Sequence, residues 1–467
     1  MGRNLLLNLT DHEIAALGFD KDSAKVKQAL VGLKGKAASS ATRNIGNFIK
    51  QLKRPRNVLL LVPAGPIVDQ VIAELRPHLQ RDDLIIDAGN SQFKDTERRE
   101  LALGKNGLLF FGMGVSGGEL GARLGPSLMP GGKKQAYNRV AQILKSIAAQ
   151  AQGKPCVTYL GPGASGHYVK MVHNGIEYGL MQLIAESYSL IKAMLMRHSF
   201  NDQFFNDECN RIFTQWNETP ELKSYLLEIT SRVFLKMDDK TEKRLIDVIR
   251  AVAKENGTGK WTCQEAMELQ IPLPTINAAV VARDLSSYEE DRKKVNSTLD
   301  GPEENFNLAL SVNTSNFLDQ LRNAYYASSI ITFAQGMAML QKAKSQHKYQ
   351  YSLESIAEIW RGGCIIRAAL LEPIAAAYRT NPKLSNLLLD PYLGSEVARM
   401  QGDLRAIVRM ASELGCSSPA LMASLSYYDG YRSVWLPENL VQAQRDYFGA
   451  HTYERVDRSG TFHTNWT

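Results

Sequence analysis

Cysteines are few in this chain of 467 residues, and long apolar runs are missing. The five cysteines are scattered, and no two of them have the C-x-x-C spacing. This pattern argues against a disulfide framework or a zinc site, so we expect a reducing compartment. No apolar stretch approaches the length of a membrane span, and no signal-peptide core opens the sequence. The sequence therefore predicts a cytoplasmic, soluble protein with no membrane partner.

Blocks of like charge are missing too. Lys and Arg exceed Asp and Glu by 55 to 48, yet no run of five or six basic residues occurs. A nucleic-acid binder would concentrate basic residues with interleaved aromatics in one patch, so we expect no nucleic-acid partner. A single basic cleft for a small anionic substrate accounts for the excess.

The first third of the chain alternates short apolar runs with helical patterns. Helical spacing occupies 23–33 and 66–78, and the apolar runs, typical of buried strands, are 13–19, 57–62, 84–89, 107–115 and 156–161. This alternation predicts an α/β domain, Rossmann-like with a parallel, doubly wound sheet, over residues 1–163.

The rest of the chain is predicted to be helical, apart from its end. Helical periodicity marks 168–197, 323–343 and 353–360, which predicts a large all-helical domain over residues 164–433. Residues 434–467 are polar and aromatic with little periodicity. We expect a C-terminal tail that must dock on another surface to be ordered.

A stripe of polar residues interrupts an otherwise apolar helix. In "YVKMVHNGIEY" (168–178), Lys170, His173, Asn174 and Glu177 follow the spacing of one helix face. One interpretation is a solvated face with a polar ladder. The other is a set of ionisable and hydrogen-bonding groups aimed into a cleft, because buried Lys and Glu are rare unless paired.

Two glycine-containing segments favour anion binding. "GVSGGELGARLGPSLMPGG" (114–132) follows a predicted strand, and its backbone N–H groups could approach a carboxylate or phosphate closely; a flexible surface loop is the alternative. "GTGKWT" (257–262) places Lys260 and Thr262 two residues apart, as a phosphate clamp would, although a helix start capped by Thr258 is also consistent.

Isolated residues add weaker signals of the same kind. Arg283 lies in an apolar segment and needs an anionic partner, which Asp284 could supply. Asn90 follows a strand, at the edge where open α/β sheets bind ligands. Arg445 and His451 lie in the tail, where solvated side chains are the alternative.

The start of the chain contains part of a dinucleotide-binding pattern. Gly2 opens a predicted helix, and Asp20 ends the next strand eighteen residues later. In a dinucleotide fold a glycine turn opens the first helix, and an acidic residue about twenty positions on binds the ribose. Gly2 fits the third glycine of that pattern, while the preceding strand and the first two glycines are absent.

Seven segments occur in this order along the chain: "GVSGGE", "SLMPGG", "HYVKMVHNGIEYG", "GTGKWT", "WRGGCIIR", "YYDGYR" and "QAQRDYFGAHTYE". Together they resemble the signatures of the 6-phosphogluconate dehydrogenase family. The resemblance runs from Gly2 to the final "HTNWT". It implies oxidation of the 3-hydroxyl of 6-phosphogluconate with NADP, or alternatively NAD, followed by loss of CO2 to give ribulose 5-phosphate. This is the reaction of the oxidative branch of the pentose phosphate pathway, and the resemblance implies no metal for it.

The resemblance also implies roles for single residues. Lys170 matches the general base for the 3-hydroxyl, and Glu177 matches the acid that protonates C1 of the enediol. The implied substrate-binding residues are Asn90, Ser116, Gly117, Gly118, His173, Asn174, Tyr178, Lys260, Thr262, Arg283, Arg445 and His451. In the family the last two reach across from a partner subunit, so a homodimer with shared active sites is expected.

The cofactor side departs from the family. A strand and a glycine turn precede "MGRN" in the family, and we expect that the sequence is trimmed there. Lys21 stands between Asp20 and Asp22 where many members have Asn-Arg-Thr, whose arginine binds the 2′-phosphate of NADP. This local chemistry leans toward NAD, while the family default is NADP. Pro63 replaces a frequent lysine and Ala88 a second glycine; the implied cofactor residues are Gly2, Asp20, Lys21, Asp22, Val62, Pro63, Ala64 and Asn90.

Other functions remain open on the residues alone. A β-hydroxyacid dehydrogenase of the hydroxyisobutyrate kind would share the Rossmann half and the lysine–asparagine helix, but not the phosphate-binding set. A non-catalytic relative would have no reason to keep both Lys170 and Glu177. A nucleic-acid binder is suggested only by the basic excess.

Overall fold

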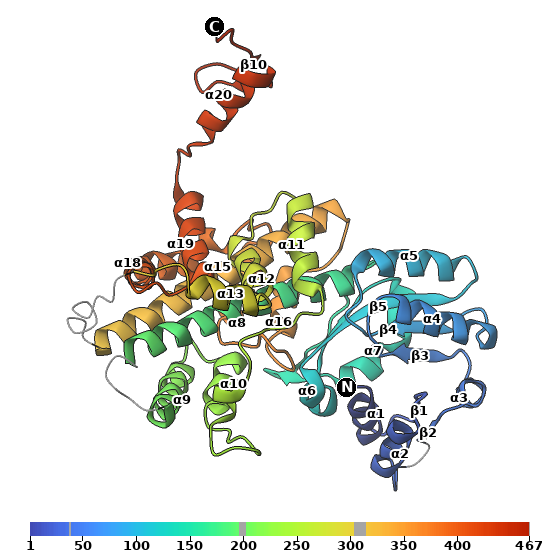
Figure 1. Cartoon of the computed structure of the whole chain (residues 1–467). Coiled ribbons are helices and arrows are strands. Elements are labelled where there is room, and N and C mark those ends of the chain that lie inside the picture. Colours follow the sequence, from blue (N-terminus) through green and yellow to red (C-terminus); the bar gives the residue numbers. More distant parts are fainter. Residues whose placement is uncertain (37–38, 196–201, 303–313, 467) are drawn as a thin grey trace.

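The structure is a computed structural model that describes residues 1–36, 39–195, 202–302 and 314–466. Figure 1 shows three parts: an α/β part formed by the N-terminal third, a larger helical body, and a C-terminal segment that stands away from that body. No helix in the described ranges is long and apolar enough to cross a membrane.

The α/β part is built on a four-stranded sheet with the order β3-β4-β5-β6. Its strands are β3 (Asn57–Leu60), β4 (Leu84–Asp87), β5 (Leu109–Ser116) and β6 (Ser127–Pro130). The first three are parallel, with Leu84 paired to Asn57 and to Leu109, whereas β6 runs antiparallel to β5. Every residue of β4 and β5 is buried, which explains why both strands read as continuous apolar runs.

Helices alternate with these strands, as the sequence predicts. They are α1 (Gly2–Asp11), α2 (Ser23–Gly32), α3 (Ile45–Gln51), α4 (Pro66–Leu75), η1 (Arg76–His78), α5 (Phe93–Gly104), α6 (Gly118–Leu124) and α7 (Lys134–Ile147). Two short strands, β1 (Leu17–Phe19) and β2 (Ser40–Thr42), pair in parallel as a separate sheet. The antiparallel β7 (Gln150–Ala151) and β8 (Lys154–Pro155) follow α7.

Two strand predictions and one loop alternative need correction. The run at 13–19 is a strand only over its last three residues. The run at 156–161 is no strand: Val157 makes one bridge to Leu128, and Gly161 takes a left-handed φ of 108° where the chain turns toward the helical body. The segment 114–132 is not a surface loop, because it contains the end of β5, α6 and the fully buried β6.

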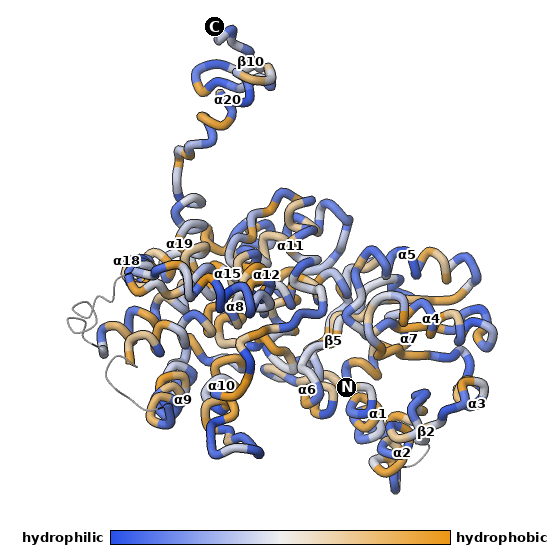
Figure 2. The backbone as a smooth tube through the Cα atoms, in the orientation of Figure 1, coloured by the Kyte–Doolittle hydropathy of each residue, from blue (hydrophilic) through white to orange (hydrophobic). Residues whose placement is uncertain are grey.

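Two long helices form the centre of the helical body, α8 (Ser165–Leu195) and α15 (Thr314–Gln346), and they pack against each other. The prediction for 168–197 is confirmed up to Leu195, and residues 196–197 lie outside the described ranges. Figure 2 shows both apolar and polar residues along the two helices, and most residues of both helices are buried.

The remaining helices pack around this pair. They are α9 (Asp202–Glu218), α10 (Tyr225–Val233), η3 (Leu245–Val248), α11 (Thr258–Glu268), α12 (Pro274–Ser286), α13 (Glu289–Asn296), α16 (Leu353–Ile359), α17 (Leu371–Thr380), η4 (Leu387–Leu389), α18 (Pro391–Glu413) and α19 (Pro419–Arg432). The predicted helices at 323–343 and 353–360 correspond to α15 and α16.

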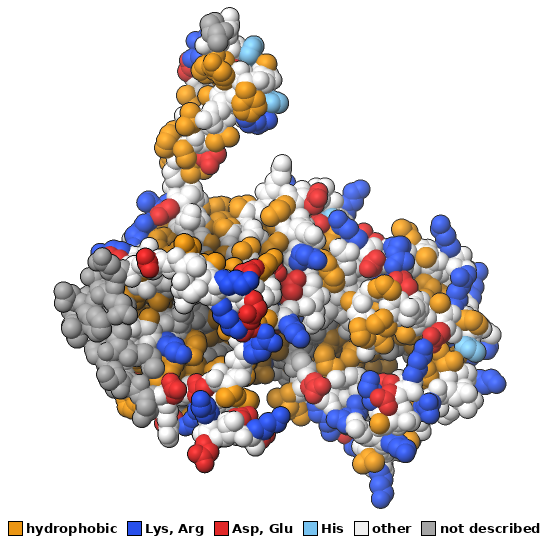
Figure 3. All heavy atoms as spheres, in the orientation of Figure 1, with side chains coloured by type: hydrophobic (Ala, Val, Ile, Leu, Met, Phe, Trp, Pro, Cys, Tyr) orange, Lys and Arg blue, Asp and Glu red, His pale blue; other side chains and the backbone are white. Residues whose placement is uncertain are grey.

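The C-terminal segment has more structure than its sequence predicts. It contains α20 (Glu438–Gly449) and the antiparallel pair β9 (Tyr453–Glu454) and β10 (Thr461–Phe462). Asp446 joins the parts of this segment, because its carboxylate accepts hydrogen bonds from the backbone N–H groups of Thr452 and Thr464 and from the Trp466 indole. The segment projects from the end of α19, and orange apolar side chains cover much of the face seen in Figure 3.

Candidate active site

Helix α8 crosses β5 at very short range, and glycines make this possible. A Cβ on Gly114 would lie 2.4 Å from the Cβ of Lys170, and one on Gly112 would lie 2.5 Å from the His167 imidazole. Gly166 of α8 in turn faces the backbone of Gly112. The glycine spacing of "GMG" in β5 therefore brings the first turns of α8 onto the end of the sheet.

The polar stripe of α8 is buried rather than solvated. Lys170 is 5% exposed, His173 0% and Asn174 8%, while the side chain of Glu177 keeps 21% exposure. The solvated-face interpretation is therefore wrong.

Burial pushes the acid and the base of this stripe toward their neutral forms. It lowers the pKa of the Lys170 ammonium, although the Glu177 carboxylate opposes the shift. Burial raises the pKa of Glu177, opposed by Lys170 and Arg283. A neutral amine and a protonated carboxyl on one helix face are suited to accept and to donate a proton, respectively.

His173 links the stripe to two other segments. Its Nδ1 lies 3.0 Å from Asn174 Oδ1, 3.5 Å from Lys170 Nζ and 3.7 Å from a carboxylate oxygen of Glu177. Its Nε2 lies 3.1 Å from Ser116 Oγ and 2.8 Å from Cys364 Sγ.

The predicted carboxylate loop adjoins this histidine. Ser116 ends β5, and Gly117 and Gly118 continue with φ values of 103° and 63°, which favour glycine. A Cβ on Gly117 would also meet the Gly363 carbonyl oxygen at 2.6 Å.

The predicted phosphate residues cluster beside Glu177 only in part. The Arg283 guanidinium stacks 3.4 Å over the Tyr178 ring and contacts the Met181 sulfur. In the part of the chain that the structure describes, these contacts, and not Asp284, hold Arg283 in place. Lys260 is exposed on the first turn of α11.

Thr262 takes a different position from the one a phosphate ligand needs. Its side chain is fully buried, and its hydroxyl faces the carbonyl oxygens of Met171 and Thr258, each at 2.9 Å. Gly175 of α8 allows this approach. Thr258 does not cap α11; instead its hydroxyl accepts a hydrogen bond from Asn174 Nδ2 at 3.1 Å.

The tail residues are not brought to this site within one chain. Arg445 is exposed on α20, where its guanidinium donates to Gln442, and His451 is exposed just beyond the helix. Both lie in the projecting segment of Figure 1, away from α8.

The ends of β1 and β2 place a further cation beside the predicted ribose residues. Asp20 is half-buried after β1, the Asp22 carboxylate caps α2, and the Lys21 ammonium lies 2.6 Å from a Glu74 oxygen. Arg43, which follows β2, donates from Nε to the Lys21 carbonyl oxygen at 3.2 Å. Its guanidinium is exposed, and sequence reasoning missed it because β2 itself was not predicted.

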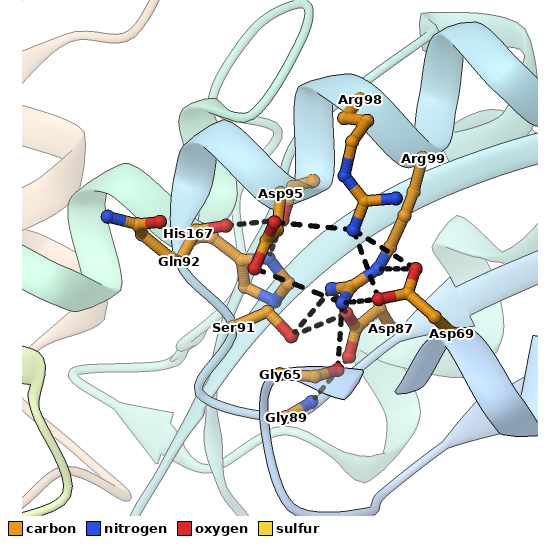
Figure 4. Close-up of polar contacts among 11 residues, drawn as sticks. Gly65, Asp69, Asp87, Gly89, Ser91, Gln92, Asp95, Arg98, Arg99 and His167 are labelled. Atoms are coloured by element: carbon orange, nitrogen blue, oxygen red, sulfur yellow. Dashed lines mark hydrogen bonds and ion pairs between the residues drawn. The ribbon is translucent and has the colours of Figure 1, made fainter. Parts of the chain in front are cut away.

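A buried polar network fixes the loops that follow β3 and β4 (Figure 4). The Arg99 guanidinium binds both Asp69 oxygens at 2.9 Å and the Gly65 carbonyl oxygen. It also reaches the fully buried Asp87 at 3.5 Å, and the Asp87 carboxylate accepts from Ser91 and from the Gly89 N–H.

This network holds the predicted cofactor loops in place. The loop that contains Val62, Pro63 and Ala64 ends at Gly65, and Asn90 lies exposed between Gly89 and Ser91. The network was not predicted, because Asp69, Asp87 and Arg99 lie in separate elements and only the fold brings them together.

The donor set at this edge suits a dinucleotide. A carboxylate at Asp20 can accept ribose hydroxyls, and the Arg43 and Lys21 cations can balance a phosphate. Among the described residues, no group of three or more His, Cys, Asp or Glu side chains is placed to hold a metal ion.

Residues 1–161 match the family model for the NAD binding domain of 6-phosphogluconate dehydrogenase, and residues 166–466 match the model for its C-terminal domain. The chain is 46% identical over 466 residues to the NADP(+)-dependent, decarboxylating 6-phosphogluconate dehydrogenase of Bacillus subtilis, covering 100% of this chain and 97% of the relative. It is 48% identical over 468 residues to the decarboxylating enzyme of Synechococcus elongatus, with the same coverage.

A solved structure agrees with these relatives. The Plasmodium falciparum 6-phosphogluconate dehydrogenase, determined in its apo form and in complexes with its cofactor NADP+ and its substrate 6-phosphogluconate, superposes with a TM-score of 0.91. Its sequence is 42% identical, and the match covers 100% of this chain and 98% of that one.

Proposed function

The chain belongs to the 6-phosphogluconate dehydrogenase family, and from this premise we propose which of its residues carry out the family's reaction. The chain is an NADP-dependent oxidoreductase of the pentose phosphate pathway. It converts 6-phosphogluconate to ribulose 5-phosphate and CO2. The single observation that best supports the assignment of roles is the placement of the buried Lys170 and the half-buried Glu177 on one face of α8.

Lys170 is the proposed general base. Its amine takes the proton of the 3-hydroxyl, and burial supports this role because it lowers the pKa of the ammonium. NADP, when bound, supplies the acceptor for the hydride. The resulting Lys170 ammonium then polarises the keto oxygen, which promotes loss of CO2. Glu177, whose pKa burial raises, holds the proton that is delivered to C1 of the enediol.

The substrate is proposed to lie along α8 with its carboxylate toward β5. Ser116, Gly117 and Gly118 hold the carboxylate, and Asn90, His173 and Asn174 hold the hydroxyls. The phosphate is bound by Tyr178, Lys260 and Arg283 of the same chain. Thr262 contributes by keeping the first turn of α11 against α8, since its hydroxyl is bonded to backbone carbonyls.

A second copy of the chain is proposed to complete the phosphate site with its own Arg445 and His451. The projecting tail supports this homodimer. Val434 is fully exposed, Trp435 is 67% and Phe448 73% exposed, and burying such side chains against a partner is favourable. We propose residues 434–467 as the arm that crosses between subunits, with residues 1–163 and 164–433 as the cofactor and substrate domains.

The cofactor is proposed to lie over Gly2, the β1 end (Asp20, Lys21, Asp22), the loop at Val62, Pro63 and Ala64, and Asn90. We add Arg43 to this set. Asp22 acts mainly as a helix cap, and Lys21 is paired with Glu74, so Arg43 is the cation best placed to receive the 2′-phosphate of NADP. We propose the cytoplasm as the location, because the scattered cysteines show no disulfide framework, as is usual for proteins of a reducing compartment.

Single-turnover kinetics test the two catalytic roles separately. Lys170→Met should block NADPH formation itself, because hydride loss requires removal of the hydroxyl proton. Glu177→Gln should form about one NADPH and one CO2 per site and then slow, because enediol protonation comes last. Identical time courses for both variants would contradict the division of roles.

A further inference from the structure

The turn after α16 braces both sides of the active site, although the reaction assigns it no role. Gly363 accepts a hydrogen bond from the Ser127 N–H at 2.8 Å, and its carbonyl oxygen occupies the space that a side chain on Gly117 would fill. The Ile365 N–H donates to Ser116 Oγ at 3.4 Å. The turn thus packs directly on the proposed carboxylate loop.

Cys364 extends this contact to the catalytic helix. Its thiol is fully buried, with Sγ 2.8 Å from His173 Nε2. The Trp360 ring meets the edge of the same imidazole, with centroids 5.5 Å apart and planes at 79°. Nε2 therefore faces only the interior, toward the thiol and the Ser116 hydroxyl, while Nδ1 faces Lys170 and Glu177.

The partners of His173 select one tautomer. Asn174 Nδ2 donates to Thr258, so Asn174 Oδ1 faces Nδ1 and requires a proton there. Burial lowers the pKa of His173 well below its usual value, so the ring is neutral and Nε2 must accept. Burial also raises the pKa of Cys364 to about 12, so its thiol is protonated and can donate.

Ser116 and Cys364 both donate to Nε2, but the Ser116 hydroxyl is also needed for another hydrogen bond. In the proposed function its hydroxyl turns to the substrate carboxylate, which leaves the thiol as the remaining donor. Without it, the opposite tautomer would gain stability, and Nδ1 would become an acceptor facing the Lys170 amine 3.5 Å away. That acceptor would take an N–H of Lys170 and stabilise its ammonium form, which would make Lys170 a poorer base.

We propose that Cys364 is a positioning residue whose S–H···Nε2 hydrogen bond keeps His173 in the Nδ1–H tautomer while substrate is bound. The inference rests on the proposed function, because it is the substrate carboxylate that draws the Ser116 hydroxyl away from Nε2.

Kinetics of three variants test the hydrogen bond. Cys364→Ala removes the donor and should lower kcat about tenfold with a KM change of less than about threefold. Cys364→Ser keeps a donor in nearly the same volume and should restore kcat to within about threefold of wild type. Cys209→Ala, which removes an equally buried thiol from α9, is the control and should match wild type.

The tautomer itself is measured on ring-15N-labelled histidine in the binary complex with 6-phosphogluconate, with a His173→Asn sample to assign the signal. Wild type and Cys364→Ser should show Nδ1–H, and Cys364→Ala should show Nε2–H. An unchanged tautomer or unchanged kcat in Cys364→Ala, or no rescue by serine, overturns the inference. Failure of the proposed function is distinct, because wild type itself would then not reduce NADP.

Discussion

Subunit complementation gives a quantitative test of the shared site. The Lys170→Met chain keeps a normal arm, and the Arg445→Ala chain keeps a normal catalytic helix. Within one chain the arm projects away from α8 (Figure 1), so each site should combine Lys170 of one subunit with Arg445 of the other. A mixed dimer then contains one site with both residues intact and one site with both replaced.

The expected magnitude follows from counting sites. Random pairing of equal amounts makes about half of the dimers mixed, and each has one of two sites intact, so the mixture should reach about a quarter of wild-type kcat/KM. Each variant alone should be far lower: loss of a charged phosphate contact costs about 10- to 100-fold in kcat/KM. Loss of the general base in Lys170→Met should lower kcat/KM by about 10²–10⁴-fold.

The assay co-expresses the two variants with different affinity tags and purifies the doubly tagged dimers. NADPH formation is measured at 6-phosphogluconate concentrations well below KM, where the phosphate contact matters most. Purified mixed dimers should show about half of wild-type kcat/KM. Activity no higher than the mean of the two single variants would refute the shared site, since it would place Arg445 in its own subunit's site.

Three further changes have defined outcomes. Arg43→Ala should weaken NADP binding, measured by calorimetry, about 10- to 100-fold and should change NAD binding little. Lys21→Ala should weaken NADP binding less than Arg43→Ala does. The reverse order would show that Lys21 holds the 2′-phosphate. Lys170→Met should raise the free energy of unfolding by about 1–2 kcal/mol at pH 7, because it removes a group that binds its proton less tightly in the folded than in the unfolded state. Because the folded-state pKa is lowered, the penalty is present while the unfolded chain is protonated and disappears as pH rises through the unfolded pKa of about 10.4. Urea titrations at several pH values should show the advantage of the variant shrink with rising pH, and a constant advantage would contradict the reasoning. Arg99→Met should lower the free energy of unfolding by about 3–5 kcal/mol, because it leaves the fully buried Asp87 carboxylate without a cation. Replacing its exposed neighbour, Arg98→Met, should cost less than about 1 kcal/mol, and equal thermal shifts would argue against the network.

Local patterns in the sequence predict much of the fold. The apolar runs of β4 and β5 and the periodicity of α8 are strong because these elements are buried on both faces or on all sides. The run at 156–161 gave a wrong prediction for a related reason. Most of its residues are buried, but the backbone turns at Gly161 instead of pairing as a strand. α20 was missed because its apolar residues do not face a core within this chain.

The site was predictable where one element carries it. Lys170, His173, Asn174 and Glu177 share a helix face, so their spacing alone indicates that they act together. Cys364 approaches His173 from 191 positions away, and no local pattern encodes that contact.

The most direct test of the central claim compares two lysines of the same helix. NADPH and CO2 formed from 6-phosphogluconate are measured for wild type, Lys170→Met and Lys192→Met, the last being exposed on α8. Wild type and Lys192→Met should form NADPH and CO2 in equal amounts, while Lys170→Met should lose about 10²–10⁴-fold in kcat and still bind 6-phosphogluconate. Wild-type turnover in Lys170→Met would contradict the assignment of the base, and no NADPH from the wild-type protein would contradict the proposed function itself.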